Sequence, residues 1–462
     1  MKKIAKFLIV LGMIGQLSSC DYLDIVPDER AQESDTWKTE GAVRGYLYSC
    51  YGYLPANRTF GNSYWLAEEL TAVTKELFTT FKYGYYSPVS LGFTSNTWST
   101  IWNGIHQCYM FQESLKQVSN EYVTDEMKKQ YLAESNFLIA YYHFLSMRSY
   151  GPTMIIRSVI DLETPISGFP ERSSIDEVVA FINEKLDEAM SEGGLPTTWS
   201  GKDYGRATRL AALALKSRVY LYAASPLYNG NTEMYADFRS PLDGRQLIAQ
   251  EKSQAKWEIS ATQTKYAIDE VEKAKFHLYH DADAGEPSDA KPGLPNKAQR
   301  RLRYTNIDNQ TGNNPEIIWA DTRNDDYYGI QRRCPPRQTL GGKFAGISMT
   351  NCPTLQTIEA FYTKNGLPIN KDKTFDYDER YEYISAPENC DGNNYEDLVK
   401  YANFTPSSDK VMRLCTDREP RFYAWTTYHN GYFEFGKYNN EEISADPAKR
   451  AIRIHLLRDD PH

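Results

Sequence analysis

The sequence predicts a mainly α-helical protein made of paired helices, together with a loop-rich, irregular part. In several long segments, apolar residues recur every three or four positions, which is the spacing of one face of an α-helix. Between these segments lie stretches rich in Gly, Pro, Asn and Asp in which the spacing is lost. At 462 residues the chain is longer than one ordinary core usually holds, so we expect a large α-rich unit or two subdomains.

The clearest helix is predicted over residues 128–152. Gly151 and Pro152 end it, because Gly accepts a left-handed cap and Pro cannot continue the hydrogen-bond ladder. Ala133 and Ala140 are small, so a neighbouring helix can pack closely there. A helix of this length needs partners to bury its apolar side. That side carries Tyr131, Ser135, Leu138, Tyr142 and Leu145.

The same periodicity predicts further helices over residues 37–54, 98–116, 174–190, 208–224, 257–276 and 354–363. Ser174 and Glu177 form a capping box at the start of one of them. Antiparallel pairs of these helices would make a helical repeat interrupted by long insertions. Two short elements are also predicted, a helical piece near residues 66–73 and a strand over 316–319, whereas helical spacing is lost over 280–351.

Residues 1–19 have the features of an export signal rather than of a folded element. A lysine-rich start precedes the apolar run 7–17, which is too short to span a bilayer in the mature protein. The run ends in Leu17-Ser18-Ser19-Cys20, which is typical of a bacterial lipobox. We therefore predict that Cys20 begins the mature chain and carries its acyl chains, and that the acidic residues 20–35 form a solvated tether.

Charge and cysteine usage exclude several classes of partner and site. The net charge is -9 and no long basic run occurs, which argues against a nucleic-acid partner. The six cysteines after Cys20 are widely spaced without C-x-x-C, so neither a zinc ribbon nor a redox motif is present. An exported chain permits disulfides, but Cys50 and Cys108 lie on apolar helix faces and are predicted to be buried thiols.

Several blocks of the chain, taken in order, resemble those of the SusD/RagB family of Bacteroidetes surface lipoproteins. The resemblance runs from the lipobox to about Phe435, with Ile139-Ala140 standing where the family has Arg-Ala. The matching blocks are Cys20 with Leu23-Asp24 and Pro27, residues 98–115, residues 133–152, Arg206-Ala207-Thr208 with Ala211-Ala212 and Leu215, residues 353–369, and residues 417–422.

The resemblance implies a scaffold of TPR-like helix pairs and a loop-rich subdomain that carries the ligand surface. It also implies a role on the outer membrane, facing the cell exterior. Such proteins cap a SusC-like TonB-dependent barrel and deliver to it a glycan or, in some members, a peptide. The family's final helix pair has no equivalent in residues 445–462, so we expect a truncated end with an uncovered helical layer.

From these observations we expect four parts. They are a signal peptide at 1–19, a tether at 20–35, a SusD-like helical scaffold at 36–276 with an inserted loop at 58–96, and a SusD/RagB C-terminal-like, loop-rich region at 277–462.

Aromatic side chains on loops are the candidate ligand-binding residues. The chain has 35 Tyr and 8 Trp; sugar rings stack on such side chains, and their polar edges need Asn, Asp or Arg nearby. Long loops such as 58–96 tend to be functional. Packing on the scaffold or docking on the transporter is the alternative for each ring. The candidates are Tyr64, Trp65, Tyr83, Tyr85, Tyr86, Tyr327 and Tyr328, with Asn62, Arg323 and Asp325 as hydrogen-bonding partners.

Enzymatic interpretations find less support in the sequence. A glycosidase needs two placed carboxylates, and candidates such as Glu68, Glu69 and Asp325 are expected by chance in a chain with 61 acidic residues. No G-x-S-x-G, H-E-x-x-H or phosphate-binding loop occurs. His277 and His280, three residues apart, are a weak candidate for a metal-binding site. We expect a non-catalytic receptor without metal or cofactor; a surface glycoside hydrolase and a peptide-binding receptor are the alternatives.

Overall fold

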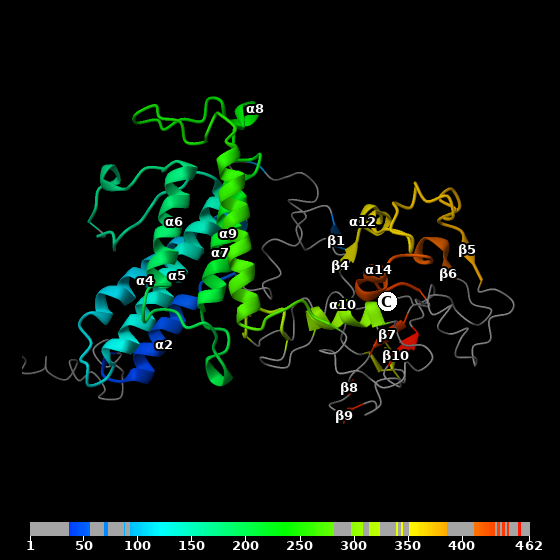
Figure 1. The fold of residues 1–462 in the computed structure, drawn as a ribbon, viewed down its shortest axis with the longest axis horizontal. Helices are drawn as coiled ribbons and strands as arrows, with labels where there is room; N and C mark the ends of the chain where they lie inside the picture. Colours follow the sequence, from blue (N-terminus) through cyan, green and yellow to red (C-terminus); the bar gives the residue numbers. More distant parts are fainter. Residues whose placement is uncertain are drawn as a thin grey trace, which may run out of the picture. The chain divides into compact units, whose positions relative to one another are not determined.

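The computed structural model describes residues 37–55, 69–72, 87, 93–161, 163–280, 297–307, 314–323, 339–340, 343–344, 351–385, 411–429, 432–434, 437–438, 441–442 and 451–453. The fold of this part is mainly α, as predicted (Figure 1). The chain divides into two compact units. Unit 1 comprises Met1–Tyr53, Trp102–Leu195 and Phe238–Leu247, and unit 2 comprises Leu54–Ile101, Pro196–Asp237 and Ile248–His462.

The described helices include long amphipathic ones and several single turns. The α-helices are α2 (Glu40–Tyr51), α4 (Phe93–Leu115), α5 (Asp125–Tyr150), α6 (Ile175–Ala189), α7 (Arg209–Ala224), α8 (Thr232–Tyr235), α9 (Gln254–Lys273), α10 (Lys297–Ile307), α12 (Leu355–Ala360) and α14 (Pro420–Trp425). The 3-10 turns are η2 (Ile166–Gly168), η3 (Gly201–Asp203) and η4 (Arg413–Cys415).

The described strands are short and form two-stranded antiparallel pairs rather than one sheet. The pairs are β1 (Leu70–Ala72) with β4 (Asn351–Pro353), β2 (Thr339–Leu340) with β3 (Lys343–Phe344), β5 (Tyr383–Ile384) with β6 (Val411–Met412), β7 (Tyr432–Glu434) with β10 (Ala451–Arg453), and β8 (Lys437–Tyr438) with β9 (Glu441–Glu442).

Helix α5 is the centre of unit 1, and α2, α4 and α6 lie beside it (Figure 1). All five residues of its predicted apolar side are buried, and so are most of the others between Ala133 and Met147. Thr124 caps its start, and Gly151 ends it with φ of 72°, the left-handed region predicted for this glycine. The central helix is therefore buried nearly all round instead of along one stripe.

Helices α5 and α6 form an antiparallel pair. The His143 ring, in the second half of α5, lies 4.7 Å from that of Phe181, in the middle of α6. At the other end, a Cβ placed on Gly194, just after α6, would lie 3.3 Å from Cβ of Ala133. Ala133, which was predicted to allow close packing, thus lies against the turn at Gly194. The helical periodicity predicted that neighbouring helices in the sequence would pair and bury their apolar sides against each other, and α5 and α6 form such a pair.

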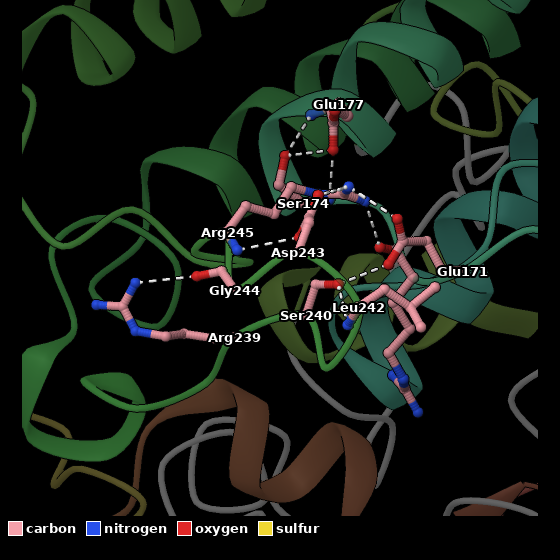
Figure 2. A network of polar contacts seen from close by, with 10 residues as sticks. Glu171, Ser174, Glu177, Arg239, Ser240, Leu242, Asp243, Gly244 and Arg245 are labelled. Atoms are coloured by element: carbon pink, nitrogen blue, oxygen red, sulfur yellow. Dashed lines mark hydrogen bonds and ion pairs between the residues drawn. The ribbon is translucent and has the colours of Figure 1, made fainter.

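A polar network fixes the start of α6 (Figure 2). Ser174 and Glu177 form the predicted capping box, which lowers the pKa of the Glu177 carboxyl because it accepts hydrogen bonds from Ser174. Figure 2 shows Arg245 between two carboxylates: its Nη1 donates to Glu171 at 2.9 Å and to Asp243 at 2.7 Å. The turn over 238–247 is thereby held against the segment that leads into α6.

In unit 2, α7 and α9 form a second antiparallel pair, and they run side by side in Figure 1. Arg209, at the start of α7, lies 3.6 Å from Glu270 near the end of α9. Asn229 donates to the carbonyl of Ala224, where α7 ends, and to that of Ser253, which precedes α9. Two helix pairs of this kind agree with a scaffold built from repeated helix pairs.

The carboxy-terminal part of unit 2 is organised around a buried arginine. Arg418 is 2% exposed, and its guanidinium donates to the carbonyls of Leu414 at 2.7 Å, Ile358 at 2.7 Å and Phe361 at 2.6 Å. These carbonyls belong to η4 and to the end of α12. The guanidinium has several N–H donors in one plane, so a single side chain can hold η4 and the end of α12 together.

Three local predictions are wrong. Within the piece near 66–73, residues Leu70–Ala72 form strand β1, because they pair with β4 far along the chain. Residues 316–319 form no strand; the segment 314–323 is held by side-chain contacts instead. The region 280–351 is not free of helix, since α10 spans Lys297–Ile307 and packs on α14. Its few apolar residues explain why periodicity does not reveal it.

Candidate functional site

Of the predicted ligand-binding residues, Arg323 lies in the part of the chain that the structure describes. The others remain predictions, because they lie outside the described residues: Tyr64, Trp65, Tyr83, Tyr85, Tyr86, Asp325, Tyr327 and Tyr328, and also the lipidation site Cys20 and the hydrogen-bonding candidate Asn62.

Arg323 acts as a clamp within unit 2. Its Nε donates to Asp321 at 2.7 Å. Its Nη1 donates to the carbonyl of Leu54 at 3.0 Å, and its Nη2 donates to that of Pro55 at 2.9 Å. These carbonyls lie just before the predicted loop at 58–96. The guanidinium is thus engaged with the protein itself, and it positions the stem of the segment that carries the predicted rings.

A small hollow also lies within unit 2. Part of its lining, residues 317–320, comes just before Asp321 and Arg323 in the sequence. The indole Nε1 of Trp199 donates to the carbonyl of Ala207 at 2.9 Å, and that of Trp319 donates to the carbonyl of Gly205 at 2.8 Å. The lining residues are Thr197, Thr198, Trp199, Tyr204, Gly205, Arg206, Thr208, Phe276, Ile317, Ile318, Trp319 and Ala320.

The size and chemistry of the hollow decide what it can hold. Its volume is about 30 Å³, which is the space of one water molecule and too little for a sugar ring. The buried Arg206 stacks over Trp199, with 4.0 Å between the guanidinium carbon and the ring centroid, and donates to Asp203 at 2.8 Å. Burial raises the pKa of the Tyr204 phenol. None of the described residues that line the hollow is a carboxylate.

A second group of rings lies on the surface of unit 2, and we call Glu359, Tyr377, Arg380 and Tyr381 the Tyr381 cluster. The Arg380 guanidinium lies between two rings, 4.0 Å from the centroid of Tyr377 and 4.4 Å from that of Tyr381. Glu359 accepts from Arg380 at 2.8 Å and from the Tyr381 hydroxyl at 2.5 Å. Tyr381 is 43% exposed, and the nearby Tyr383 is 54% exposed.

The Tyr381 cluster has one exposed ring, Tyr381, whereas the Tyr377 ring is partly buried against the apolar core of this region. An exposed ring beside ordered polar groups is the composition of a sugar platform. Hydrogen bonds from Tyr381 and Arg380 hold the pKa of Glu359 below its usual value, so this carboxylate stays ionised. An ionised carboxylate committed to two donors is a poor proton donor for glycoside cleavage. The sequence analysis did not identify this cluster, because its rings lie between the helix predicted at 354–363 and the family block at 417–422. The closely spaced Tyr377, Tyr381 and Tyr383 are nevertheless visible in the sequence.

The described residues contain neither a cluster of metal-binding side chains nor a helix suited to cross a membrane. Nowhere in that part of the chain do three or more His, Cys, Asp or Glu side chains gather as a metal site would require. The rings of His277 and His280 are 5.2 Å apart, while Asp281 and Asp283 lie outside the described residues. Among the described helices, none combines the length and apolar character needed to cross a bilayer.

Comparison with known proteins gives matches over most of the chain. A family model described as "Starch-binding associating with outer membrane" matches residues 21–221. A second model, described as "SusD family", matches residues 315–452. No curated protein matches the sequence.

Solved structures resemble the fold. The structure titled "BT4246" is 29% identical with a TM-score of 0.68, and the match covers 86% of this chain and 66% of that one. A SusD-like protein (BF3747) from Bacteroides fragilis NCTC 9343 is 18% identical with a TM-score of 0.59, covering 92% of this chain and 65% of that one. The chain thus spans about two thirds of the length of these proteins. Two family models in the predicted order, on a matching mainly α fold, place the chain in the SusD/RagB family.

Proposed function

We propose that this protein is a non-catalytic, cell-surface lipoprotein that binds a glycan or oligosaccharide and delivers it to a TonB-dependent outer-membrane transporter. The observation that carries the proposal is the match of residues 21–221 to a family model described as starch-binding and associated with the outer membrane. The lipobox at Cys20 supports the location, since acyl chains would hold the protein at the membrane without a spanning helix.

Two surfaces support glycan binding. The first is the predicted ring-bearing loop at 58–96, whose stem Arg323 holds at Leu54 and Pro55. The second is the Tyr381 cluster, where the exposed Tyr381 ring lies beside an ion pair between Arg380 and Glu359. The hollow at Trp199 and Trp319 is too small for a sugar ring, so we assign it a structural role in holding residues 317–322.

The absence of catalysis is part of the proposal. None of the described residues that line the hollow is a carboxylate, and the Glu359 carboxylate accepts hydrogen bonds from Arg380 and Tyr381. Both features suit a site that holds a ligand through stacking and hydrogen bonds and then releases it unchanged.

Calorimetry of a soluble form that begins after Cys20, against a panel of plant and host glycans that includes starch, tests the function. Binding without release of reducing sugar supports the receptor. Release of product in the absence of any added enzyme indicates the alternative, a surface glycoside hydrolase. Binding of peptides but of no glycan in the panel indicates the peptide-binding alternative.

The transporter partner needs a separate test. The full chain, carrying a carboxy-terminal affinity tag, is extracted from outer membranes in mild detergent and purified. Co-purification of a TonB-dependent barrel at equal stoichiometry supports delivery to a transporter. A Cys20→Ser variant is the matched control, because it removes the lipid and leaves the folded part of the chain intact. Recovery of the wild-type protein from the cytosol would contradict the proposed location.

A further inference from the structure

Two buried thiols meet inside unit 1, where α2 and α4 pass each other. Cys50 lies in the last turn of α2, and Cys108 lies in the second half of α4; neither side chain is exposed. Burial, together with the nearby Cys50 thiol, raises the pKa of the Cys108 thiol. No disulfide joins Cys50 and Cys108 in this structure.

Neighbouring contacts show independently that the two helices are in register. The hydroxyl of Tyr46, one turn before Cys50, donates to Gln107 at 3.0 Å. The Tyr46 ring also stacks on Phe111, with centroids 5.8 Å apart. Moving one turn forward on α2 from Tyr46 and one turn backward on α4 from Phe111 brings Cys50 opposite Cys108, because the helices run antiparallel.

Helix α5 holds both cysteine positions from one side. The hydroxyl of Tyr142 donates to the carbonyl of Cys50 at 2.6 Å, and Ser135 Oγ donates to that of Cys108 at 3.2 Å. A Cβ added to Gly104, one turn before Cys108, would lie 2.8 Å from the Tyr142 ring. The three helices are thus closely packed around the two cysteines.

We propose that Cys50 and Cys108 form a disulfide bond when the chain folds in an oxidising compartment. The inference rests on the proposed cell-surface location, because disulfides persist in exported proteins and are rare in the cytosol. One thiolate attacks the disulfide of an oxidant, such as oxidised glutathione or a thiol–disulfide oxidoreductase, and displaces one thiol. The second cysteine then attacks the mixed disulfide; the oxidant leaves as two thiols, and the protein has lost two hydrogen atoms.

The timing of the reaction follows from burial. The thiolate is the reactive form, and burial raises the pKa of Cys108, so the folded, reduced protein reacts slowly. The bond therefore forms during folding, before α2, α4 and α5 exclude the oxidant. The residues between the two cysteines include the predicted ring-bearing loop at 58–96. The cross-link would tie both ends of that segment to one scaffold and reduce its freedom in the unfolded chain.

Refolding of the soluble form tests the pairing directly. The chain is unfolded, reduced, refolded in a glutathione redox buffer, and unfolded again without reductant in the presence of an alkylating reagent. Mass spectrometry of the peptides is expected to find Cys50 joined to Cys108, with Cys352 and Cys415 alkylated. Cys352→Ala is the matched control and keeps the linked pair, whereas Cys50→Ala and Cys108→Ala each abolish it; circular dichroism reports whether each variant folds.

Two results would overturn the inference: alkylation of both Cys50 and Cys108 after refolding, or their pairing with other cysteines. The wild-type labelling decides this even if a variant fails to fold. Folded, reduced protein placed in the same buffer is expected to stay unoxidised. Protein isolated from outer membranes is labelled in parallel; its absence from that fraction counts against the proposed function, while the refolding result still decides the pairing.

Discussion

Replacing Arg418 by Met should selectively unfold the carboxy-terminal part of unit 2. The guanidinium makes hydrogen bonds of 2.6 to 2.7 Å to three backbone carbonyls. Methionine fills much of the same volume but leaves these buried acceptors without donors. Each hydrogen bond to a charged group is worth about 1.5–3 kcal/mol, and removal of the charge recovers part of its desolvation cost. We therefore expect a loss of about 3–5 kcal/mol in the free energy of unfolding of this region.

Hydrogen exchange is the appropriate assay, because the two units need not unfold as a single two-state system. In the Arg418→Met variant, amides in residues 355–385 and 411–429 should exchange faster by about two to three and a half orders of magnitude, at about 1.4 kcal/mol per tenfold change. Peptides from α5 and α6 should exchange at the wild-type rate.

Arg421→Met is the matched control. Arg421 lies in the same short helix, its side chain is 47% exposed, and it pairs with Glu419 on the surface. We expect the control to change the free energy by less than about 1 kcal/mol. Equal exchange rates in the two variants, or a loss below about 1 kcal/mol for Arg418→Met, would refute the view that the carbonyls left without donors cause most of the loss in the free energy of unfolding.

Three further perturbations test other parts of the structure. Burial lowers the pKa of His143 to about 4 from 6.5, so the unfolded state binds more protons than the folded state between these pH values. The free energy of unfolding should therefore fall by about 3 kcal/mol as the pH drops from 6.5 to 4. Denaturation curves with the same pH slope for the wild type and for His143→Phe would contradict this. Ser174→Ala removes a cap from α6 and should cost about 1 kcal/mol, measured by urea denaturation, with the exposed Ser191→Ala as control. Gly205→Ala should destabilise the segment by about 1–3 kcal/mol, because Gly205 has φ of 98° and a Cβ would lie 2.8 Å from Thr322; a melting temperature equal to the wild type would show that the contact relaxes freely.

The helical scaffold is the part of the fold that local sequence determines. Helices α6, α7 and α9 begin and end within a few residues of the predicted boundaries, and Ser174 and Thr208 cap α6 and α7. Periodicity and capping act over three or four residues, so they can be recognised in the sequence without knowing the rest of the fold. The resemblance to the SusD/RagB family likewise rests on sequence blocks, which the two family models match.

The candidate sites were less predictable. Arg323 was proposed as a ligand partner, and the structure places its guanidinium on Asp321 and on the carbonyls of Leu54 and Pro55. The Tyr381 cluster was not proposed, because nothing local indicates that Arg380 lies between two rings and that Glu359 accepts from both sides.

By itself the sequence determined where the long helices lie, which family the blocks resemble and where a lipid anchor is expected. Only the tertiary structure decided that Leu70–Ala72 is a strand, that Arg418 serves three carbonyls and that the register of α2 and α4 brings Cys50 opposite Cys108. The physical reason is range. Helix formation depends on neighbours within a turn, whereas strand pairing, buried hydrogen bonds and thiol contacts join residues that are close only after the chain has folded.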